Sequence, residues 1–156
     1  MSDRPPPAGD RSPHAVAVLP RESYTSWTTR VLAHAIDLIP VAVAFGIGWG
    51  VQAGAEESSL GVTTLGLVVL AALGYGVWNF GYRQGTTGSS IGKSITGFQV
   101  VSELTWQPIG FMLSLLRQLA HVIDGAICYV GYLFPLWDSK RQTIADKIMT
   151  TVCVPL

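Results

Sequence analysis

Residues 30–37 read Arg-Val-Leu-Ala-His-Ala-Ile-Asp, and residues 117–124 read Arg-Gln-Leu-Ala-His-Val-Ile-Asp. The two octapeptides are identical at six positions, and each one opens a long apolar run. Positions i, i+4 and i+7 lie on one face of an α-helix, so arginine, histidine and aspartate form a polar stripe on each predicted helix. An ionisable side chain inside an apolar membrane helix is costly unless it is paired or hydrated. We therefore look for functional residues in these two stripes.

The composition is typical of a membrane protein. The chain has 156 residues, which is enough for one domain. Hydrophobic residues make up 49% of it and charged residues 13%, against roughly 25% charged residues in soluble domains. Ten basic and ten acidic residues cancel, so no global field favours nucleic acid as a partner. The two cysteines, Cys128 and Cys153, lack metal-type spacing, and we expect two free thiols.

Two stretches are long enough to cross a bilayer, because about 20 apolar residues span a hydrocarbon core of about 30 Å. We expect the first transmembrane helix at about 31–51 and the second at about 60–80. Residues 1–22 are rich in proline and polar residues, which predicts a disordered cytoplasmic tail. The rest of the chain, residues 23–155, forms the predicted membrane domain.

The distribution of basic residues predicts how the first two spans are oriented. The segment 52–59 between them contains no lysine or arginine. Basic residues precede the first span or follow the second, at Arg4, Arg11, Arg21, Arg30, Arg83 and Lys93. Because basic segments are enriched on the cytoplasmic side of a membrane, we expect the N-terminus in the cytoplasm.

The third apolar region, at about 110–137, has two interpretations. A single span fits its length, but it would place the basic C-terminal segment on the side that the positive-inside rule disfavours. Alternatively, the helix breaks near Asp124 and Gly125 and turns back as a re-entrant hairpin, which is tolerated where protein covers the backbone. The second interpretation would let two predicted short strands, at 98–101 and 151–154, pair at the membrane surface. The predicted fold class is therefore an all-α membrane protein with this short β pairing.

The two polar stripes predict a polar pocket between the first and third apolar regions, lined by His34, Asp37, His121 and Asp124. In the alternative interpretation, Arg30 and Arg117 anchor to headgroups and the aspartates pair with nearby cations to hold the helices together. The two His-x-x-Asp pairs lack the additional glutamate ligands of dimetal helical bundles, so we predict no metal site.

No pattern in the chain indicates an enzyme. The segment Gly85–Ser94 resembles a phosphate-binding loop, but Thr87 stands where that loop needs its first glycine. A membrane span precedes the segment, whereas a phosphate-binding loop follows a buried strand. We also find no Ser-His-Asp or Cys-His arrangement, and we expect neither catalysis nor a cofactor.

Four motifs in order resemble the RDD family of small bacterial integral membrane proteins, which is named for one arginine and two aspartates. Arg30 at the start of the first helix and Asp37 within it match the first two positions. Asp146 matches the third, in a C-terminal motif Arg-Gln-x-x-x-Asp-x-x-x-x-Thr-x-Val that begins at Arg141. The chain departs from this motif at Cys153, where the family has valine.

A glycine-rich block extends the resemblance to about residues 24–155. It has the family form Gly-x-x-x-Gly-Lys-x-x-x-Gly-x-x-Val-Val, with the characteristic residues at Gly88, Gly92, Lys93 and Gly97. The second octapeptide, with Arg117, His121 and Asp124, has no counterpart among the residues that name the family.

The resemblance implies a multi-pass protein of the bacterial inner membrane whose molecular role is largely unassigned. Its partners would be the lipid bilayer and either further copies of the chain or another membrane protein. One hypothesis is transport of a small ligand or ion by an oligomer, in which Asp37 and Asp124 bind a cation or proton. The other is an accessory or assembly subunit of a larger membrane complex, in which the charged stripes serve helix packing.

Overall fold

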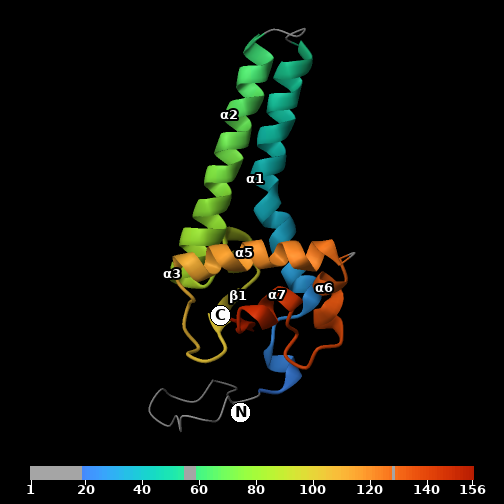
Figure 1. Ribbon diagram of the computed structural model, residues 1–156, viewed down its shortest axis with the longest axis vertical. Coiled ribbons are helices and arrows are strands. Elements are labelled where there is room, and N and C mark those ends of the chain that lie inside the picture. The colour runs from blue at the N-terminus through green and yellow to red at the C-terminus, as the bar shows by residue number, and fades with distance from the viewer. Residues whose placement is uncertain (1–18, 55–58, 128) are drawn as a thin grey trace.

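The computed structural model describes residues 19–54, 59–127 and 129–156, and it has two parts (Figure 1). A long helical hairpin extends away from a base that contains the short helices and the sheet. Most of the predicted disordered tail at 1–22 and the centre of the predicted loop at 52–59 lie outside the described residues. Cys128, one of the two predicted free thiols, also lies outside them.

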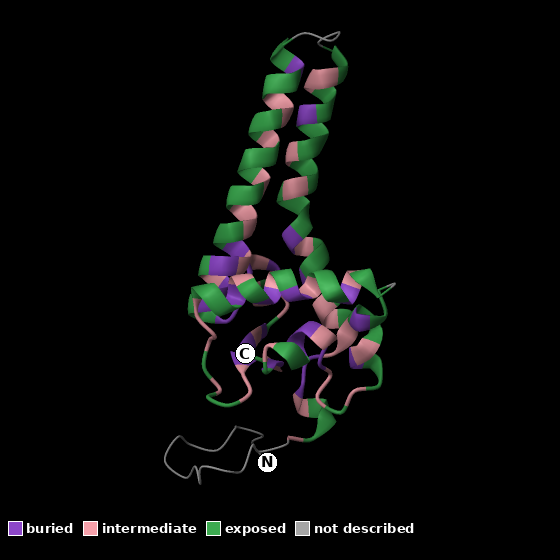
Figure 2. Cartoon of the chain, viewed as in Figure 1, coloured by how far each residue is buried: buried purple, intermediate pink, exposed green. Residues whose placement is uncertain are grey.

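The hairpin consists of α1 (Trp27–Gly54) and α2 (Ser59–Gly76). A π-helical segment, η2 (Val77–Arg83), and α3 (Gln84–Thr87) continue α2 toward the base. Both long helices are apolar enough and long enough to cross a membrane, which confirms the two predicted spans. Their side chains are mostly exposed in the isolated chain (Figure 2), as expected for surfaces that face lipid.

The base contains a two-stranded antiparallel sheet. After α4 (Ile91–Ile95), strand β1 (Phe98–Ser102) pairs with β2 (Thr151–Pro155). Phe98 lies opposite Pro155 and Ser102 lies opposite Thr151. The predicted pairing of the two short strands is confirmed, and it fixes the C-terminal segment beside the segment that follows the second span.

The third apolar region is broken rather than straight. Helix α5 (Phe111–Ala126) is followed by α6 (Val130–Leu133) and the 3₁₀ turn η3 (Phe134–Leu136). The axis of α5 makes an angle of 105° with the axis of the helical segment at 130–136. Of the two interpretations of this region, the structure has the one in which the helix breaks near Asp124 and Gly125.

Helix α5 crosses the base of the hairpin (Figure 1) and is amphipathic. Its buried face carries Ser114, Arg117 and Asp124, whereas Leu119 and Val122 on the other face are 62% and 66% exposed. The polar face thus points into the protein and the apolar face points outward, the reverse of a helix on a water-soluble domain. Such a helix is suited to lie in the headgroup region of a membrane.

The N-terminal and C-terminal segments meet in the base. A 3₁₀ turn, η1 (Arg21–Ser23), precedes α1, and the backbone N–H of Thr25 donates to the carbonyl of Cys153 at 2.9 Å. Tyr24 is buried against Val101 of β1 and Val152 of β2. Cys153, the other predicted free thiol, is unpaired and buried. The core is therefore concentrated below the hairpin, as Figure 2 also shows.

Candidate functional site

The residue that joins the two polar stripes is Asp146. It lies in α7 (Ile144–Ile148), is fully buried, and completes a capping box with Thr143 at the start of that helix. Its Oδ2 accepts from Nη1 of Arg30 at 2.8 Å, and its Oδ1 accepts from Nη2 of Arg117 at 2.6 Å. Thr151 also donates to Oδ1, at 3.1 Å. The arginines of both octapeptides therefore converge on one carboxylate.

Electrostatics keeps Asp146 ionised. Burial alone would raise the pKa of its carboxyl, but Arg117 and Arg30 outweigh that effect and hold the pKa far below its usual range. Two buried guanidinium groups and one buried carboxylate leave one net positive charge at this cluster. A buried ion cluster that lost its central carboxylate would leave two unpaired arginines, which is strongly destabilising.

Asp37 of the first octapeptide has different partners. It is fully buried in α1, where it accepts hydrogen bonds from Asn79 at 2.8 Å, from the hydroxyl of Ser90 at 2.6 Å and from the backbone N–H of Gly92 at 2.7 Å. These neutral donors surround the carboxylate and attach α4 and the end of the second span to α1. Asp37 therefore connects three segments that lie far apart in the sequence.

The glycine-rich block makes this arrangement possible. Gly92 lies so close to α1 that a Cβ atom there would overlap the carbonyl oxygen of Ala33 and would come within 3.0 Å of the Cγ of Asp37. Gly88 ends α3 with φ +80°, and Gly97 turns the chain into β1 with φ +76°; both values lie in the left-handed region that favours glycine. Lys93 follows Gly92 on α4.

Asp124 of the second octapeptide has its partners on α5 itself and on α7. It is fully buried and lies 2.6 Å from Nδ1 of His121, one turn earlier on α5. It also accepts from the backbone N–H of Ala145 at 3.3 Å, which ties α5 to α7. The ring of His121 stacks on the ring of Tyr132, with 5.5 Å between their centroids.

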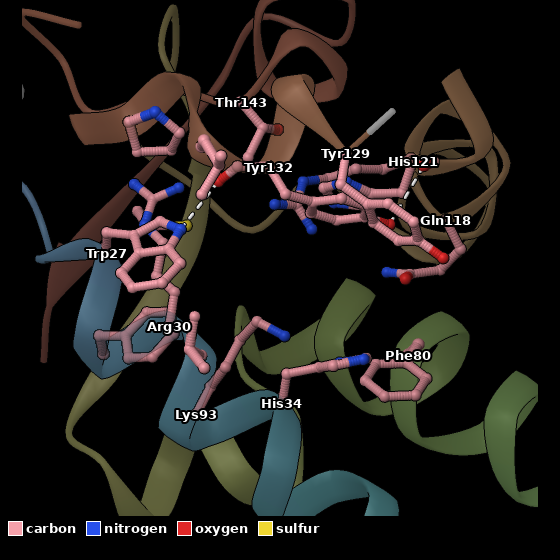
Figure 3. Close-up of a pocket in the computed structure, with 16 residues that line it drawn as sticks. Trp27, Arg30, His34, Phe80, Lys93, Gln118, His121, Tyr129, Tyr132 and Thr143 are labelled. Atoms are coloured by element: carbon pink, nitrogen blue, oxygen red, sulfur yellow. Dashed lines mark hydrogen bonds between the residues drawn. The ribbon is translucent and has the colours of Figure 1, made fainter. Parts of the chain in front are cut away.

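The two stripes face each other across a cavity of about 510 Å³ at the base of the hairpin. We call it the juxtamembrane cavity. Figure 3 shows side chains of α1 and α4 on one side of it and side chains from α5 onward on the other. The lining residues that matter for its chemistry are Trp27, Arg30, His34, Lys93, Arg117 and His121. Aromatic side chains, among them Phe80 and Tyr132, form much of the remaining wall.

The juxtamembrane cavity is positively charged. Among the residues that the structure describes, its lining contains two arginines and a lysine but no aspartate or glutamate. The Nη2 atom of Arg30 is buried and has no hydrogen-bond partner within the described part of the chain. Lys93 is half-buried, and its Nζ is 3.3 Å from the hydroxyl of Ser90 and 5.4 Å from the centre of the Phe80 ring. Burial first, and the neighbouring Arg117 second, lower the pKa of the Lys93 ammonium to about 8.

The structure brings together part of the predicted pocket. His34 and His121 both line the juxtamembrane cavity, with Arg30 and Arg117 beside them. The two aspartates that we expected there, Asp37 and Asp124, do not line it and hold the surrounding elements in place. Asp146 contacts the two arginines and is likewise absent from the lining.

Sequence reasoning did not identify several residues of the site. Asn79 belongs to none of the motifs described above, yet it is fully buried and donates to Asp37. A polar amide side chain at the end of an otherwise apolar run is the sequence feature that marks Asn79 as a candidate. Trp27 also lies outside those motifs; its indole N–H donates to the carbonyl of Tyr132 at 2.8 Å, and Trp27 lines the cavity. Tyr132 itself had no distinguishing pattern.

The part of the chain that the structure describes contains no group of three or more histidine, cysteine, aspartate or glutamate side chains that could hold a metal ion. The carboxylates of Asp37, Asp124 and Asp146 instead face hydrogen-bond donors from the protein. The prediction that the protein has no metal site remains a prediction.

Comparison with known proteins gives the family. The model of the RDD family matches residues 24–150. The chain is 53% identical over 162 residues to a proline-rich antigen homolog of Mycobacterium tuberculosis, in two strains, with 91% of this chain and 68% of that protein covered. It is 50% identical to the proline-rich antigen of Mycobacterium leprae, covering 65% of that protein. No solved structure matches the chain.

The helical hairpin, the outward apolar face of α5 and the buried ion cluster define a helical membrane protein with a polar base. More specifically, the chain belongs to the RDD family. Arg30, Asp37 and Asp146, the residues that the resemblance singled out, occupy structurally distinct positions. Arg30 and Asp146 are bonded to each other, whereas Asp37 lies two turns farther along α1 and holds α4.

Proposed function

We propose that this protein binds a small anionic ligand in the juxtamembrane cavity, as the binding step of transport across the membrane. The observation that carries the proposal is the charge of the cavity. Among the described residues, three cationic side chains and no acidic one line it. Charge-assisted hydrogen bonds from these side chains would hold an anion.

Transport requires more than one copy or a partner, because two membrane-crossing helices enclose little of a pathway. The hairpin offers surfaces for such assembly. At Gly46 and Gly50 on α1, a Cβ atom would meet no other atom within 4 Å, and pairs of small residues at this spacing allow close helix contact in membranes. We propose a homo-oligomer, or a complex with another membrane protein, that binds and moves its ligand without chemical conversion.

We further propose that the protein is a multi-pass protein of the bacterial inner membrane with its base in the cytoplasm. Basic residues belong to the base together with the N-terminal segment: Arg83 donates to the carbonyl of Ser89, Lys93 lines the cavity beside Trp27 and Arg30, and Lys140 pairs with Glu103. The positive-inside rule favours the cytoplasm for that end.

The second candidate function is an accessory or assembly subunit. Its supporting observation is that Asp146 bonds Arg30 and Arg117 together. In that case the charged stripes serve mainly to pack α1, α5 and α7 into a platform for a partner, and the juxtamembrane cavity has no ligand.

Anion binding is tested with the detergent-solubilised full chain and inorganic phosphate. We expect phosphate, titrated against chloride at constant ionic strength, to raise the unfolding temperature. Lys93→Gln should weaken this effect several-fold, because a charged donor is lost from the cavity. The matched control is Lys147→Gln, a lysine that pairs with Asp138 and does not line the cavity. Equal phosphate responses in the two variants would refute the proposed site.

Transport is tested separately, in reconstituted vesicles with radiolabelled phosphate. Uptake by the unaltered chain that falls in Lys93→Gln but not in Lys147→Gln is the expected result. Absence of uptake, together with recovery of one stoichiometric membrane partner that is lost on Asp146→Asn, would favour the accessory subunit instead.

A further inference from the structure

The apolar part of the juxtamembrane cavity limits the kind of anion that fits. A cavity for a small hydrated ion needs only the charged side chains, yet Trp27, Phe80, Tyr129, Tyr132 and Leu133 also line this one. An occupant that fills about 510 Å³ must therefore bury apolar surface as well as charge. This indicates a ligand with an anionic head and an apolar chain.

The apolar wall is continuous with the surface of the hairpin. Val31 lines the cavity and is 46% exposed. Leu38 lies two turns farther along α1, on the same helical face, and is 45% exposed. A chain that leaves the cavity at Val31 can pass the exposed Ala35 and Leu38 along this face toward the hydrocarbon region.

The number of cationic side chains on the cavity wall indicates the kind of anionic head. Arg30, Lys93 and Arg117 all line the cavity, and the nearby carboxylates of Asp37, Asp124 and Asp146 lie behind its wall. A phosphate monoester carries about −1.5 to −2 charges near neutral pH and has three strong acceptor oxygens. These oxygens suit cationic side chains that approach from different elements, here Arg30 on α1, Lys93 on α4 and Arg117 on α5.

We propose that the juxtamembrane cavity binds a phosphate monoester carried on an apolar chain. The phosphate lies between Arg30, Lys93 and Arg117, and the chain passes Val31 toward the lipid. The phosphate can come from a membrane lipid with a monoester headgroup or from a soluble amphiphile. This inference rests on the proposed anion-binding function and names the class of its ligand.

The test compares octyl phosphate with two probes that each lack one feature. Inorganic phosphate lacks the chain, and octyl sulfate carries the same chain with a single charge. Dissociation constants are measured with the full chain in bilayers of phosphatidylcholine. We expect octyl phosphate to bind at least about ten-fold more tightly than either probe, and Lys93→Gln to reduce this affinity about ten-fold, as one charge-assisted hydrogen bond implies. Lys147→Gln should leave it unchanged.

The outcomes separate this inference from the proposed function. If inorganic phosphate binds as tightly as octyl phosphate, or octyl sulfate does, the cavity binds anions but the assigned ligand class is wrong. If none of the three anions binds, both proposals fail. Leu133→Gln provides a second check because it makes the apolar wall polar and leaves the cations in place. This variant should bind octyl phosphate more weakly and bind inorganic phosphate as the unaltered chain does.

The two sources of the phosphate are distinguished by adding phosphatidic acid to the bilayer. Reduced binding of octyl phosphate in its presence identifies a lipid headgroup as the competing occupant. Undiminished binding identifies a soluble amphiphile. Either result supports the phosphate monoester as the ligand.

Discussion

At the scale of single residues, Asp146 has the greatest structural consequence. One carboxylate accepts hydrogen bonds from arginines on α1 and α5, which are 87 positions apart in the sequence by the numbers of Arg30 and Arg117. The shared carboxylate offsets the repulsion between the two guanidinium groups, which is strong where water is scarce. The two polar stripes therefore meet through Asp146.

Asp146→Asn is expected to lower the free energy of unfolding by about 3–5 kcal/mol, because the change removes a buried charge and leaves two buried guanidinium groups without a counter-ion. Chemical denaturation of the detergent-solubilised chain measures this loss. The control is Asp138→Asn, which removes a charge opposite Lys147, whose side chain is 43% exposed. That pair should contribute at most about 1 kcal/mol. Similar losses in the two variants would contradict the central role of Asp146.

The pKa of Lys93 predicts how the affinity for an anion depends on pH. Its pKa falls from an ordinary 10.5 to about 8, so the ammonium loses its proton as pH rises through about 8. We expect anion affinity to decline between about pH 7 and about pH 9, because the neutral amine no longer attracts the ligand. The titratable or charged groups that face Lys93 are Arg30, His34, Asp37, Arg117, His121, Asp146 and Cys153.

Lys93→Gln isolates the contribution of the lysine from that of its neighbours. The alkaline decline should disappear in this variant, and an unchanged decline would assign the pH dependence to another group. The lowered pKa of Lys93 also makes the stability of the fold depend on pH. Since the folded-state pKa is depressed, the fold is penalised below about pH 8, and the penalty is relieved as pH rises toward the unfolded value of 10.5.

At the scale of elements, α4 and α5 determine the shape of the base. Helix α4 lies against α1 because Gly92 permits backbone contact and its N–H donates to Asp37. Helix α5 turns its charged face inward and its apolar face outward, so it lies across the hairpin. The cavity occupies the space between these two attachments, so its size depends on both contacts.

Gly92→Ala is expected to destabilise the fold by about 1–3 kcal/mol or more, because the added Cβ overlaps the carbonyl of Ala33 and forces α4 away from α1. The thermal unfolding midpoint and phosphate binding should both fall. Gly74→Ala is the matched control: nothing lies within 4 Å of its Cβ position on α2, and alanine is the better helix former. A midpoint for Gly92→Ala equal to that of the control would show that α4 does not contact α1 as described.

At the scale of the whole molecule, the base gathers segments from both ends of the chain. The segment before α1 bonds β2, and β2 pairs with the strand that follows α4. The end of α1 and the start of α2 lie at the opposite end of the molecule (Figure 1). The proposed multi-pass arrangement therefore requires the N-terminal segment and the C-terminal strand on one side of the membrane and the tip of the hairpin on the other.

Labelling with a membrane-impermeant thiol reagent tests this arrangement. In a Cys128→Ser background, Gly54→Cys at the tip should react in intact cells, whereas Leu156→Cys should react only after the cells are opened. Both positions are exposed in the structure, and the native Cys153 is 1% exposed and should stay unreactive. Reaction of Leu156→Cys in intact cells would contradict a base in the cytoplasm, and reaction of both positions from the same side would contradict the hairpin itself.

Local sequence pattern was sufficient to predict part of this fold. The lengths of the two apolar runs predicted the two long helices, and β-branched residues at 98–101 and 151–154 predicted the strand pair. The spacing of Arg30, His34 and Asp37 placed them along one side of a helix, because that periodicity is a property of the helix alone. These features depend on interactions between residues that are close in sequence or on simple length.

Only the tertiary structure decided which partners those side chains have. Helical spacing states that Arg30 and Asp37 share a side of α1, but it does not state that one bonds Asp146 and the other bonds Gly92. The third apolar region had two interpretations for the same reason. Its length fits a single span, whereas the structure has a break just after buried Asp124, whose carboxylate accepts from the backbone of α7. Pairing between distant charges is determined by the mutual packing of helices, which local sequence does not encode.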